Sequence, residues 1–369
     1  MKKSGLIIHL ALAGILIVTF SLMPLLMPGE RGNARDDLPT AAGLRLSASR
    51  GLVYVQQPGN ALLTGVNHLD SSSPIEFQKS VVSDTNFDKQ WAIQLIRVPE
   101  VWQLTTSDPN IIVAILDTGI DRYQEDLEGK VVTEINFTDS PTSLDVRGHG
   151  THISGIIAAS NNNGKGVAGL APESRLMNVK VADDSGQTYS KIVAKGLVWA
   201  ADQGASVINL SLSFKEPSSE LEAAIDYAWN RGAVIVAAAG NEGSGLPIYP
   251  AYYDNCIAVT SSTENDMLAP LSNFGDWVDV AAPGINIYST LPDNNYGYKS
   301  GTSFATAYVS GLAALLFSVV TDRNGNGRLN DEVRESIESG CQATGIGTGK
   351  GRIDALRSYE KATVKVSVS

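Results

Sequence analysis

The chain has 369 residues, of which 43% are hydrophobic and 35 are glycine, and its formal net charge at pH 7 is −11. This length and composition suit one large α/β domain with extensions. The acidic balance argues against nucleic acid as a partner, because binding to phosphates requires a basic surface. With only two cysteines, Cys256 and Cys341, the chain has no disulfide framework, and two free thiols or one bridge are the alternatives.

The first 34 residues have the features of an export signal. Lys2 and Lys3 precede an apolar run over residues 6–27, and residues 32–34 offer a small-x-small cleavage site. Because the run is long enough to cross a bilayer, an uncleaved membrane anchor is the alternative to cleavage after Ala34. The sequence therefore predicts an extracellular location, either secreted or tethered to the outer face of the cell membrane.

Residues 35–83 lose strong periodicity and gather turn formers, such as the stretches 57–60 and 70–74. One strand is predicted at residues 52–55. Taken alone, this composition is that of a linker.

From residue 84 onward, short apolar runs alternate with helical spacing, as a parallel sheet with helices on both faces requires. The predicted strands are 111–116, 176–181, 206–211, 233–238 and 256–260, and the predicted helices between them are 189–203 and 219–231. Ligands of such sheets collect at the carboxyl ends of the strands. Asp117 follows the first predicted strand and is therefore a candidate site residue.

Two other stretches carry groups suited to nucleophilic chemistry. His149, within Gly148-His149-Gly150-Thr151-His152, precedes a predicted small-residue helix at 153–160. Ser303 lies in Gly301-Thr302-Ser303-Phe304-Ala305-Thr306, at the predicted start of a buried helix that Thr302 or Ser303 would cap. The backbone N–H of a serine at a helix start lies at the positive end of the helix dipole, where it can stabilise an oxyanion.

The three motifs around Asp117, His149 and Ser303 resemble those of the subtilisin-like serine peptidases, most of all the subtilisin and thermitase branch. Their chain order is Asp, His, Ser, and the resemblance covers residues 84 to 359. It implies a three-layer α/β fold with a mostly parallel central sheet, and an endopeptidase that cleaves protein substrates through an acyl-enzyme intermediate. The chain order and the lack of a G-x-S-x-G elbow argue against an esterase or lipase.

The resemblance also implies a role for each site residue. Ser303 would be the nucleophile, His149 the general base, and Asp117 the group that orients the imidazole. Asn241 resembles the family's side-chain oxyanion donor, and His152 its second, structural histidine. Ala307 and Tyr308 stand where the family usually has proline and histidine, so a catalytically impaired binding protein is the alternative function.

A peptidase holds its substrate extended, as an added β-strand. By resemblance the flanking strands are Ser185-Gly186-Gln187 and Ser211-Leu212-Ser213, and the pocket for the side chain before the cut bond is formed by Ala238, Ala239, Gly240 and Ile248. Ser213, Phe214 and Ile248 replace smaller residues of the family. They predict a preference for small or medium apolar side chains.

Calcium is the implied cofactor, with two candidate sites. One resembles the family's calcium loop and uses Asp126, Ser160 and Asn162. The other follows the spacing D-x-N-x-N-G and uses Asp322, Asn324 and Asn326, although Val333 stands at loop position twelve, where an acid is usual. The alternative for this second stretch is a polar turn in which Asn330 caps a helix over residues 331–338.

The resemblance assigns four parts to the chain: a signal or anchor at 1–34, a propeptide at 35–83, the catalytic domain at 84–359 and a tail at 360–369. Enzymes of this kind are usually made with an inhibitory leader, so the chain's own propeptide is an expected partner besides protein or peptide substrates. A disordered linker is the alternative for 35–83.

Overall fold

The computed structural model describes residues 45–49, 52–57, 60–62 and 82–364, and the chain divides into two compact units, Met1–Ile75 and Glu76–Ser369. In the first unit, strands β1 (Arg45–Ser49), β2 (Leu52–Gln57) and β3 (Asn60–Leu62) form an antiparallel sheet in the order β1-β2-β3. The strand predicted at 52–55 is confirmed within β2.

The predicted export signal at 1–34 lies outside the described residues. Among the residues that are described, no helix combines the length and apolar character needed to span a membrane.

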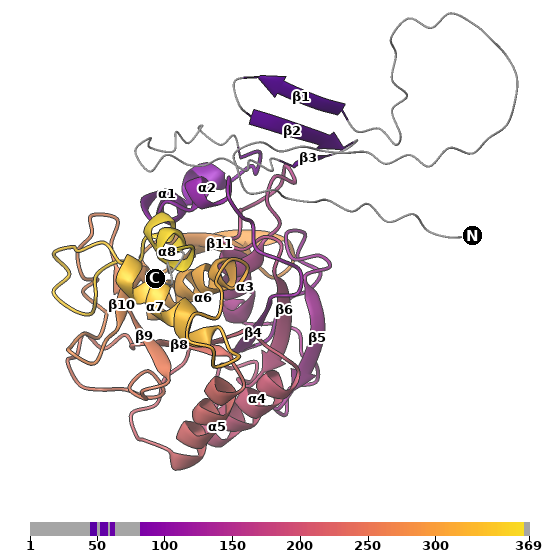
Figure 1. Cartoon of the computed structure of the whole chain (residues 1–369). Coiled ribbons are helices and arrows are strands. Elements are labelled where there is room, and N and C mark those ends of the chain that lie inside the picture. The colour runs from indigo at the N-terminus through magenta and orange to yellow at the C-terminus, as the bar shows by residue number, and fades with distance from the viewer. Residues whose placement is uncertain (1–44, 50–51, 58–59, 63–81, 365–369) are drawn as a thin grey trace, which may run out of the picture. The chain divides into compact units, whose positions relative to one another are not determined.

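The second unit is built on a seven-stranded sheet (Figure 1). Its strands are β4 (Ile112–Asp117), β5 (Val131–Asn136), β6 (Arg175–Lys180), β7 (Val207–Leu210), β8 (Val234–Ala238), β9 (Cys256–Ser262) and β10 (Val280–Pro283). They lie in the order β10-β9-β8-β7-β4-β6-β5, and every neighbouring pair is parallel. The chain adds strands on one side of β4 and then on the other, so the carboxyl ends of β4 and β7 form a switch point, the usual place for a ligand.

Helices cover both faces of this sheet because successive side chains of a strand point to opposite sides. On β4, Val113 and Ile115 belong to one hydrophobic cluster, and Ala114 and Leu116 to another. The first cluster includes residues of α1 (Trp91–Leu95), α2 (Val98–Val101), α3 (His149–Ala158), α6 (Thr302–Phe317), α7 (Asn330–Gly340) and α8 (Ala355–Ala362); the second includes residues of α4 (Ser190–Asp202) and α5 (Ser219–Asn230). The predicted three-layer α/β fold is confirmed.

Helix α6 is the most deeply buried helix near the switch point, with every residue from Thr302 to Leu316 buried. Its sequence is apolar or small on all sides, as a central helix requires. The predicted cap by Thr302 or Ser303 is wrong: the N-cap is Gly301, with no side-chain cap, since the Thr302 hydroxyl bonds Asn241 instead. The helix continues through Ala307, where a proline would have removed a backbone donor.

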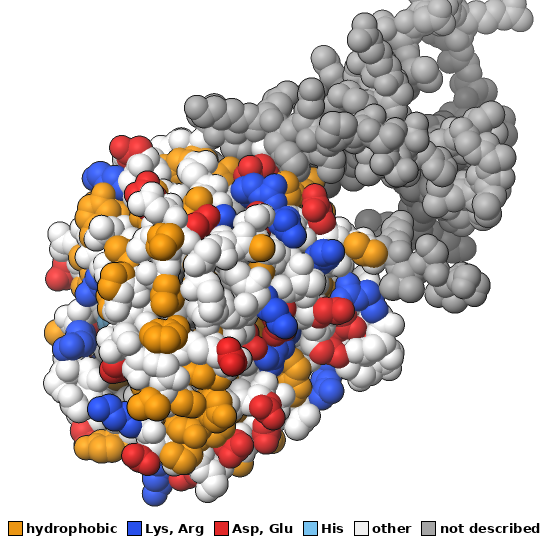
Figure 2. Space-filling view, turned by 90° about the vertical axis from the view of Figure 1, so that its left-hand side faces the viewer, with side chains coloured by type: hydrophobic (Ala, Val, Ile, Leu, Met, Phe, Trp, Pro, Cys, Tyr) orange, Lys and Arg blue, Asp and Glu red, His pale blue; other side chains and the backbone are white. Residues whose placement is uncertain are grey.

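Several elements were not predicted. They are the 3₁₀ helix η1 (Phe87–Lys89), helices α1 and α2, strands β5 and β10, and the hairpin of β11 (Ile287–Leu291) and β12 (Asn295–Lys299). Cys256 and Cys341 are both buried and unpaired, which decides between the two alternatives in favour of free thiols. Acidic and basic side chains are interspersed over the face in Figure 2, without a broad surface of one sign.

Candidate active site

Asp117 and His149 meet at the switch point. Asp117 ends β4 and His149 begins α3, and the Nδ1 atom of His149 lies 2.7 Å from Oδ1 of Asp117. Gly150 makes this approach feasible, because a Cβ atom there would lie 2.1 Å from the Gly119 carbonyl oxygen. The carboxylate of Asp117 is 3% exposed and the imidazole 25%, so the acid is enclosed while the base faces the cleft.

Asp145, which the sequence reasoning missed, organises the loop that precedes His149. Its buried carboxylate accepts hydrogen bonds from the backbone N–H groups of Arg147, Gly148 and Thr151 and from the hydroxyls of Thr118 and Thr151. The signal for it was an acid placed just before a helix start, where free N–H groups need an acceptor.

Ser303 is the second residue of α6 and lies at the same cleft as His149. A pocket of about 510 Å³ is lined by Arg147, His149, Asn241, Lys299, Ser300, Gly301, Ser303 and Phe304. The Ser303 hydroxyl donates to the Ser211 carbonyl oxygen at 3.2 Å rather than to the imidazole. Catalytic hydrogen bonds are often incomplete in the absence of substrate.

The amide of Asn241 has a defined orientation. Its Oδ1 accepts hydrogen bonds from the Thr302 backbone N–H at 2.8 Å and the Thr302 hydroxyl at 3.1 Å. Since a backbone N–H can only donate, the oxygen must face Thr302, which leaves the Nδ2 donor of Asn241 without a partner among the described residues. Glycine is favoured at position 301 because its φ is +151°, a backbone conformation that residues with a side chain rarely adopt.

The two histidines of α3 have opposite pKa shifts. Burial lowers the pKa of His149, but the charge and hydrogen bond of Asp117, with a smaller effect of Asp145, raise it to a net value above normal. Burial lowers the pKa of His152 to about 3, so this residue is neutral at ordinary pH. Its Nε2–H donates to the Gly297 carbonyl oxygen at 3.0 Å, and its ring packs edge-on against Phe304.

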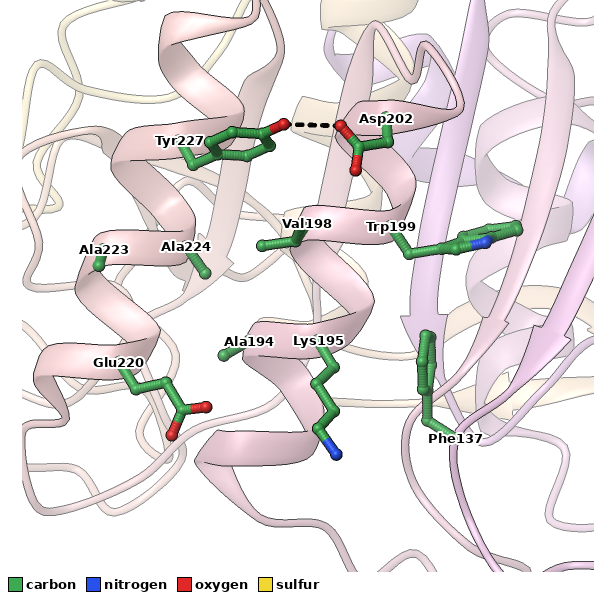
Figure 3. Close-up of a pocket in the computed structure, with 10 residues that line it drawn as sticks. All are labelled: Phe137, Ala194, Lys195, Val198, Trp199, Asp202, Glu220, Ala223, Ala224 and Tyr227. Carbon is green, nitrogen blue, oxygen red and sulfur yellow. Dashed lines mark hydrogen bonds between the residues drawn. The ribbon is translucent and has the colours of Figure 1, made fainter.

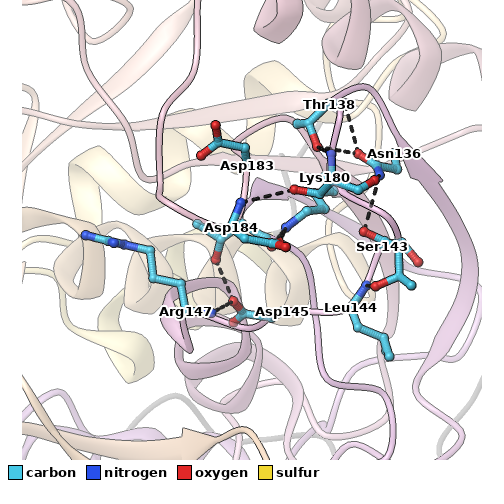
Figure 4. A network of polar contacts seen from close by, with 12 residues as sticks. Asn136, Thr138, Ser143, Leu144, Asp145, Arg147, Lys180, Asp183 and Asp184 are labelled. Atoms are coloured by element: carbon cyan, nitrogen blue, oxygen red, sulfur yellow. Dashed lines mark hydrogen bonds and ion pairs between the residues drawn. The ribbon is translucent and has the colours of Figure 1, made fainter.

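Behind the site, a fully buried lysine supports the turn after Asp117 (Figure 4). The Lys180 ammonium donates to the Thr118 carbonyl oxygen and pairs with Asp184 at 2.9 Å. The register pairs Lys180 with Asp117 across β6 and β4. An aliphatic residue there would leave the Thr118 carbonyl without this donor.

The two predicted substrate-binding segments flank a second pocket, but neither is a strand. This pocket, of about 280 Å³, is lined by Asp117, Thr118, Arg147, His149, Ala182, Gly186, Thr188, Ser211, Leu212 and Ser213. Residues 185–187 form a turn, in which Asp183 Oδ1 accepts from the backbone N–H groups of Ser185 and Gln187. The polar turn former Asp183 outweighs the weak strand tendency of these residues.

The residues expected to form the pocket before the cut bond lie beside Asn241. Ala238 ends β8, Ala239 and Gly240 continue from it, and Ile248 is buried against Gly240. Phe214 pairs through its backbone with Tyr249 and packs against the core cluster that includes α4 and α5. Phe214 and Ile248 are not among the residues that line the two pockets described above.

A larger groove of about 600 Å³ lies between α4 and α5 and contains none of the candidate catalytic residues (Figure 3). It is lined by Phe137, Ala194, Lys195, Val198, Trp199, Asp202, Glu220, Ala223, Ala224 and Tyr227. A hydrogen bond of 2.7 Å from the Tyr227 hydroxyl to Asp202 links the two helices.

In the first candidate calcium loop, protein donors occupy the carboxylates. Asp126 accepts hydrogen bonds from the side chains of Asn163 and Tyr296 and from the Val167 backbone N–H. The carboxylate oxygens of Asp84 accept from the backbone N–H groups of Asn162 and Asn163. Burial and the nearby charge of Asp126 raise the pKa of Asp84.

The other predicted ligands of this loop are engaged as well. The Asn162 side-chain oxygen accepts from the Ser83 N–H, and Ser160 donates its backbone N–H to the Asp126 carbonyl oxygen. N–H and hydroxyl donors therefore occupy the oxygens that would have to bind a cation. In this arrangement the loop does not fit a bound calcium ion.

In the second candidate loop the side-chain oxygens of Asp322, Asn324 and Asn326 also accept backbone N–H groups, but oxygens of the helix start beside them have no partner. Asp322 accepts from the backbone N–H groups of Gly325 and Gly327, while the amides of Asn324 and Asn326 both donate to Asp331 Oδ2. Three consecutive residues that begin α7 carry a buried oxygen without a partner: Asn330 Oδ1, Asp331 Oδ1 and Glu332 Oε2.

The predicted helix cap by Asn330 is wrong. Asn330 is the first residue of α7, and its amide donates to the carbonyl oxygens of Trp229 and Ala233. Val333, at loop position twelve, is buried in the core, whereas Glu332 accepts from the backbone N–H groups of Arg323 and Asn324. No cluster of three or more His, Cys, Asp or Glu side chains suited to a metal occurs in the described part of the chain, so any cation there would need amide, carbonyl or water oxygens.

The fold and the cleft define a class of protein, a serine hydrolase with a parallel sheet, its serine at a helix start, its acid at a strand end and its imidazole at a second helix start. The chain order differs from that of enzymes with a nucleophile elbow. Comparison with known proteins narrows this class.

The family model described as the subtilase family matches residues 108–339. Thermitase from Thermoactinomyces vulgaris is 44% identical over 276 residues, which are 74% of this chain and 96% of that protein. A thermophilic serine proteinase from Bacillus sp. strain AK1 is 45% identical over 261 residues, covering 70% of this chain and 63% of that protein's length. A solved protease structure from Pseudoalteromonas arctica PAMC 21717 has a TM-score of 0.70 at 28% identity, covering 77% of this chain and 100% of its own.

The chain therefore belongs to the subtilase family, in its subtilisin and thermitase branch, and is a serine endopeptidase. These relatives do not favour the alternative of an inactive binding protein.

Proposed function

We propose that this endopeptidase hydrolyses peptide bonds of protein substrates through the triad Asp117, His149 and Ser303. The observation that carries the proposal is the hydrogen bond of 2.7 Å between Asp117 and His149 beside the pocket that Ser303 also lines. A rotation about the Cα–Cβ bond of Ser303 turns its hydroxyl from the Ser211 carbonyl towards the imidazole when substrate binds.

The chemistry follows from these positions. His149 takes the proton of Ser303 as the hydroxyl oxygen attacks the substrate carbonyl, and later gives it to the leaving amine. Asp117 holds Nδ1–H of His149, so that Nε2 is the basic atom, and stabilises the imidazolium. Water then hydrolyses the acyl-enzyme by the same proton transfers.

The tetrahedral intermediate carries a negative oxygen that needs donors already in position. The free Nδ2 of Asn241 and the backbone N–H of Ser303 at the start of α6 are the two donors in this proposal. Because Thr302 holds the Asn241 oxygen, the donor does not have to reorient as the charge develops.

The substrate lies extended between the segments 185–187 and 211–213, with its side chain before the cut bond held by residues 238–240 and Ile248. A preference for small or medium apolar side chains at that position follows from the bulk of Ser213 and Ile248. Comparable cleavage after Phe and after Ala or Leu in a peptide library would contradict this preference.

The test of the triad is labelling by a fluorophosphonate combined with casein hydrolysis. We expect wild type to do both and Ser303→Ala to do neither, while Ser219→Ala, which changes an exposed serine of α5, behaves as wild type. Labelling that persists in Ser303→Ala would place the nucleophile elsewhere.

We further propose that the protein is exported through residues 1–34 and is made with a propeptide at 35–83 ahead of a catalytic domain at 84–359. N-terminal sequencing of mature wild type and of Ser303→Ala tests this maturation. A mature N-terminus near residue 84 in wild type only is the expected result, and identical N-termini in both forms would argue against self-cleavage.

We also propose that calcium binds the loop over residues 322–332. The support for this proposal is that Asn330, Asp331 and Glu332 each carry a buried oxygen without a hydrogen-bond partner. Burying such an oxygen costs free energy unless a proton donor or a cation binds it. Asp322, Asn324 and Asn326 carry further oxygens at the predicted spacing, and these would have to release the backbone N–H groups that they now accept before they could bind the ion.

Melting of the Ser303→Ala protein with calcium or with chelator tests this site, because a ligand at about 100 times its Kd adds about 2.7 kcal/mol of stability. Glu332→Gln should remove the calcium effect and Glu220→Gln, at an exposed position of α5 with no contact to the loop, should keep it. If instead Asp126→Asn removes it, the first loop is the site; if calcium has no effect in any form, neither loop binds it.

A further inference from the structure

Two cationic side chains line the catalytic pocket. Arg147 precedes Gly148 and His149 in sequence, and Lys299 ends β12, two residues before Gly301. Both line the pocket that contains His149 and Ser303, and no aspartate or glutamate is among the residues that line it. The pocket is therefore cationic, although the chain as a whole has a net charge of −11.

Neither cation forms an ion pair with a carboxylate in the part of the chain that the structure describes. The Arg147 guanidinium donates to the Ser185 carbonyl oxygen at 2.8 Å, and no carboxylate among the described residues pairs with it. The Lys299 ammonium makes no ion pair or hydrogen bond with any described group, although it is close enough to His149 to lower the pKa of that imidazole somewhat.

The nearby acids are already engaged. Both carboxylate oxygens of Asp145 are occupied by backbone and hydroxyl donors. Asp184 pairs with Lys180, and Asp117 with His149. Two positive charges therefore face the cleft without an ion pair to a described carboxylate, and an anionic group of a substrate could supply one.

The two cations differ in the pockets that they line. Arg147 lines the pocket with Ser303 and also the second pocket, with Gly186 and Leu212, where the acyl part of the substrate is proposed to bind. Lys299 lines the pocket with Ser303 but not the second pocket, so it is the cation available to the leaving part of the substrate.

We propose that the enzyme prefers substrates with acidic side chains beside the cut bond. Arg147 pairs with an acidic side chain before the cut bond, and Lys299 pairs with one after it. The proposal rests on the proposed function and names the substrate class of the same site. Partly exposed ion pairs of this kind contribute modestly, so each well-placed glutamate should raise kcat/KM about twofold to fivefold over glutamine. The preference weakens with added salt, because ions screen exposed charges.

The experiment uses internally quenched peptides that share one cleavage site and differ by a single glutamate or glutamine at each of the two positions before and after the cut bond. Wild type, Arg147→Gln, Lys299→Gln and Lys195→Gln are compared at low and high salt. Lys195 is an exposed lysine of the α4–α5 groove and serves as the matched control for loss of a positive charge.

We expect Arg147→Gln to remove the glutamate preference before the cut and Lys299→Gln to remove it after the cut, while Lys195→Gln keeps both. Equal cleavage of glutamate and glutamine peptides by wild type would overturn the proposal while leaving the endopeptidase function intact. A preference that survives in both cleft variants would also overturn it. Cleavage of none of the peptides, together with no casein hydrolysis, would instead refute the proposed function.

Discussion

Replacing Asp145 with asparagine tests how the loop before His149 controls the catalytic base. The carboxylate accepts hydrogen bonds at 2.8–3.0 Å from the Thr118 hydroxyl and the N–H groups of Arg147 and Gly148 on one oxygen, and from the N–H and hydroxyl of Thr151 on the other. Asparagine keeps one acceptor oxygen and presents an NH₂ group in place of the other.

The least costly orientation turns the NH₂ group towards Thr151, whose hydroxyl can rotate to accept. The buried Thr151 N–H then loses its acceptor, which costs about 1–3 kcal/mol, and the remaining bonds lose the strengthening effect of a charge. We expect Asp145→Asn to lower stability by about 2–3 kcal/mol, which is a melting decrease of roughly 5 °C for a domain of this size.

The same change removes a negative charge that helps to raise the pKa of His149. The imidazolium then becomes less favourable, the pKa falls, and the acid limb of kcat/KM against pH moves to lower pH. The assay is a pH profile with a neutral fluorogenic peptide, with melting measured in the Ser303→Ala background. Asp139→Asn, at an exposed carboxylate of the same connection, is the control. An acid limb that stays in place, or moves to higher pH, would refute the electrostatic reasoning.

Two further predictions concern Asn241 and His152. Asn241→Ala should lower kcat about 100-fold to 1,000-fold because a donor to the oxyanion is lost, and it should also lower stability by about 1–3 kcal/mol because the buried Thr302 N–H loses its acceptor; a loss confined to KM would contradict the oxyanion role. For His152, the folded pKa of about 3 lies below the unfolded value of 6.5, so between these values only the unfolded state binds the proton. Stability should therefore fall by about 1.4 kcal/mol per pH unit through this group as pH drops from 6.5 towards 3. Urea unfolding of Ser303→Ala protein with and without His152→Gln should show a shallower pH dependence in the variant, and equal slopes would mean that His152 is protonated in the folded state.

The strands and helices with strong patterns were predictable from sequence. The runs that became β4, β6, β7, β8 and β9 are mostly apolar, as strands covered on both faces tend to be, and α4 and α5 show helical spacing. Strand β5 was not predicted, because it lies at the sheet edge and is only partly buried. Its residues include Thr133 and Glu134, so it has no continuous apolar run.

The residues of the candidate site also include some that the sequence predicts and some that it does not. Asp117, His149, Ser303 and Asn241 stand in stretches whose local pattern already suggests a strand end, a helix start or a turn, so the residue types and their order could be predicted. The role of Lys180 could not, because it acts on the Thr118 carbonyl oxygen, which lies 62 positions away in the chain. Asp145 was within reach, because most of its donors lie two to six residues after it.

The sequence by itself determined the chemical groups, the alternation of strand and helix, and the family of the chain, since these depend on residue type and short-range spacing. Only the tertiary structure decided which oxygens of the two calcium loops keep a donor, that Asn330 does not cap its helix, and that Arg147 and Lys299 face the cleft without an ion pair to a described residue. The physical reason is that hydrogen bonding and electrostatic pairing depend on distances of a few ångströms between segments whose separation in sequence carries no information about them.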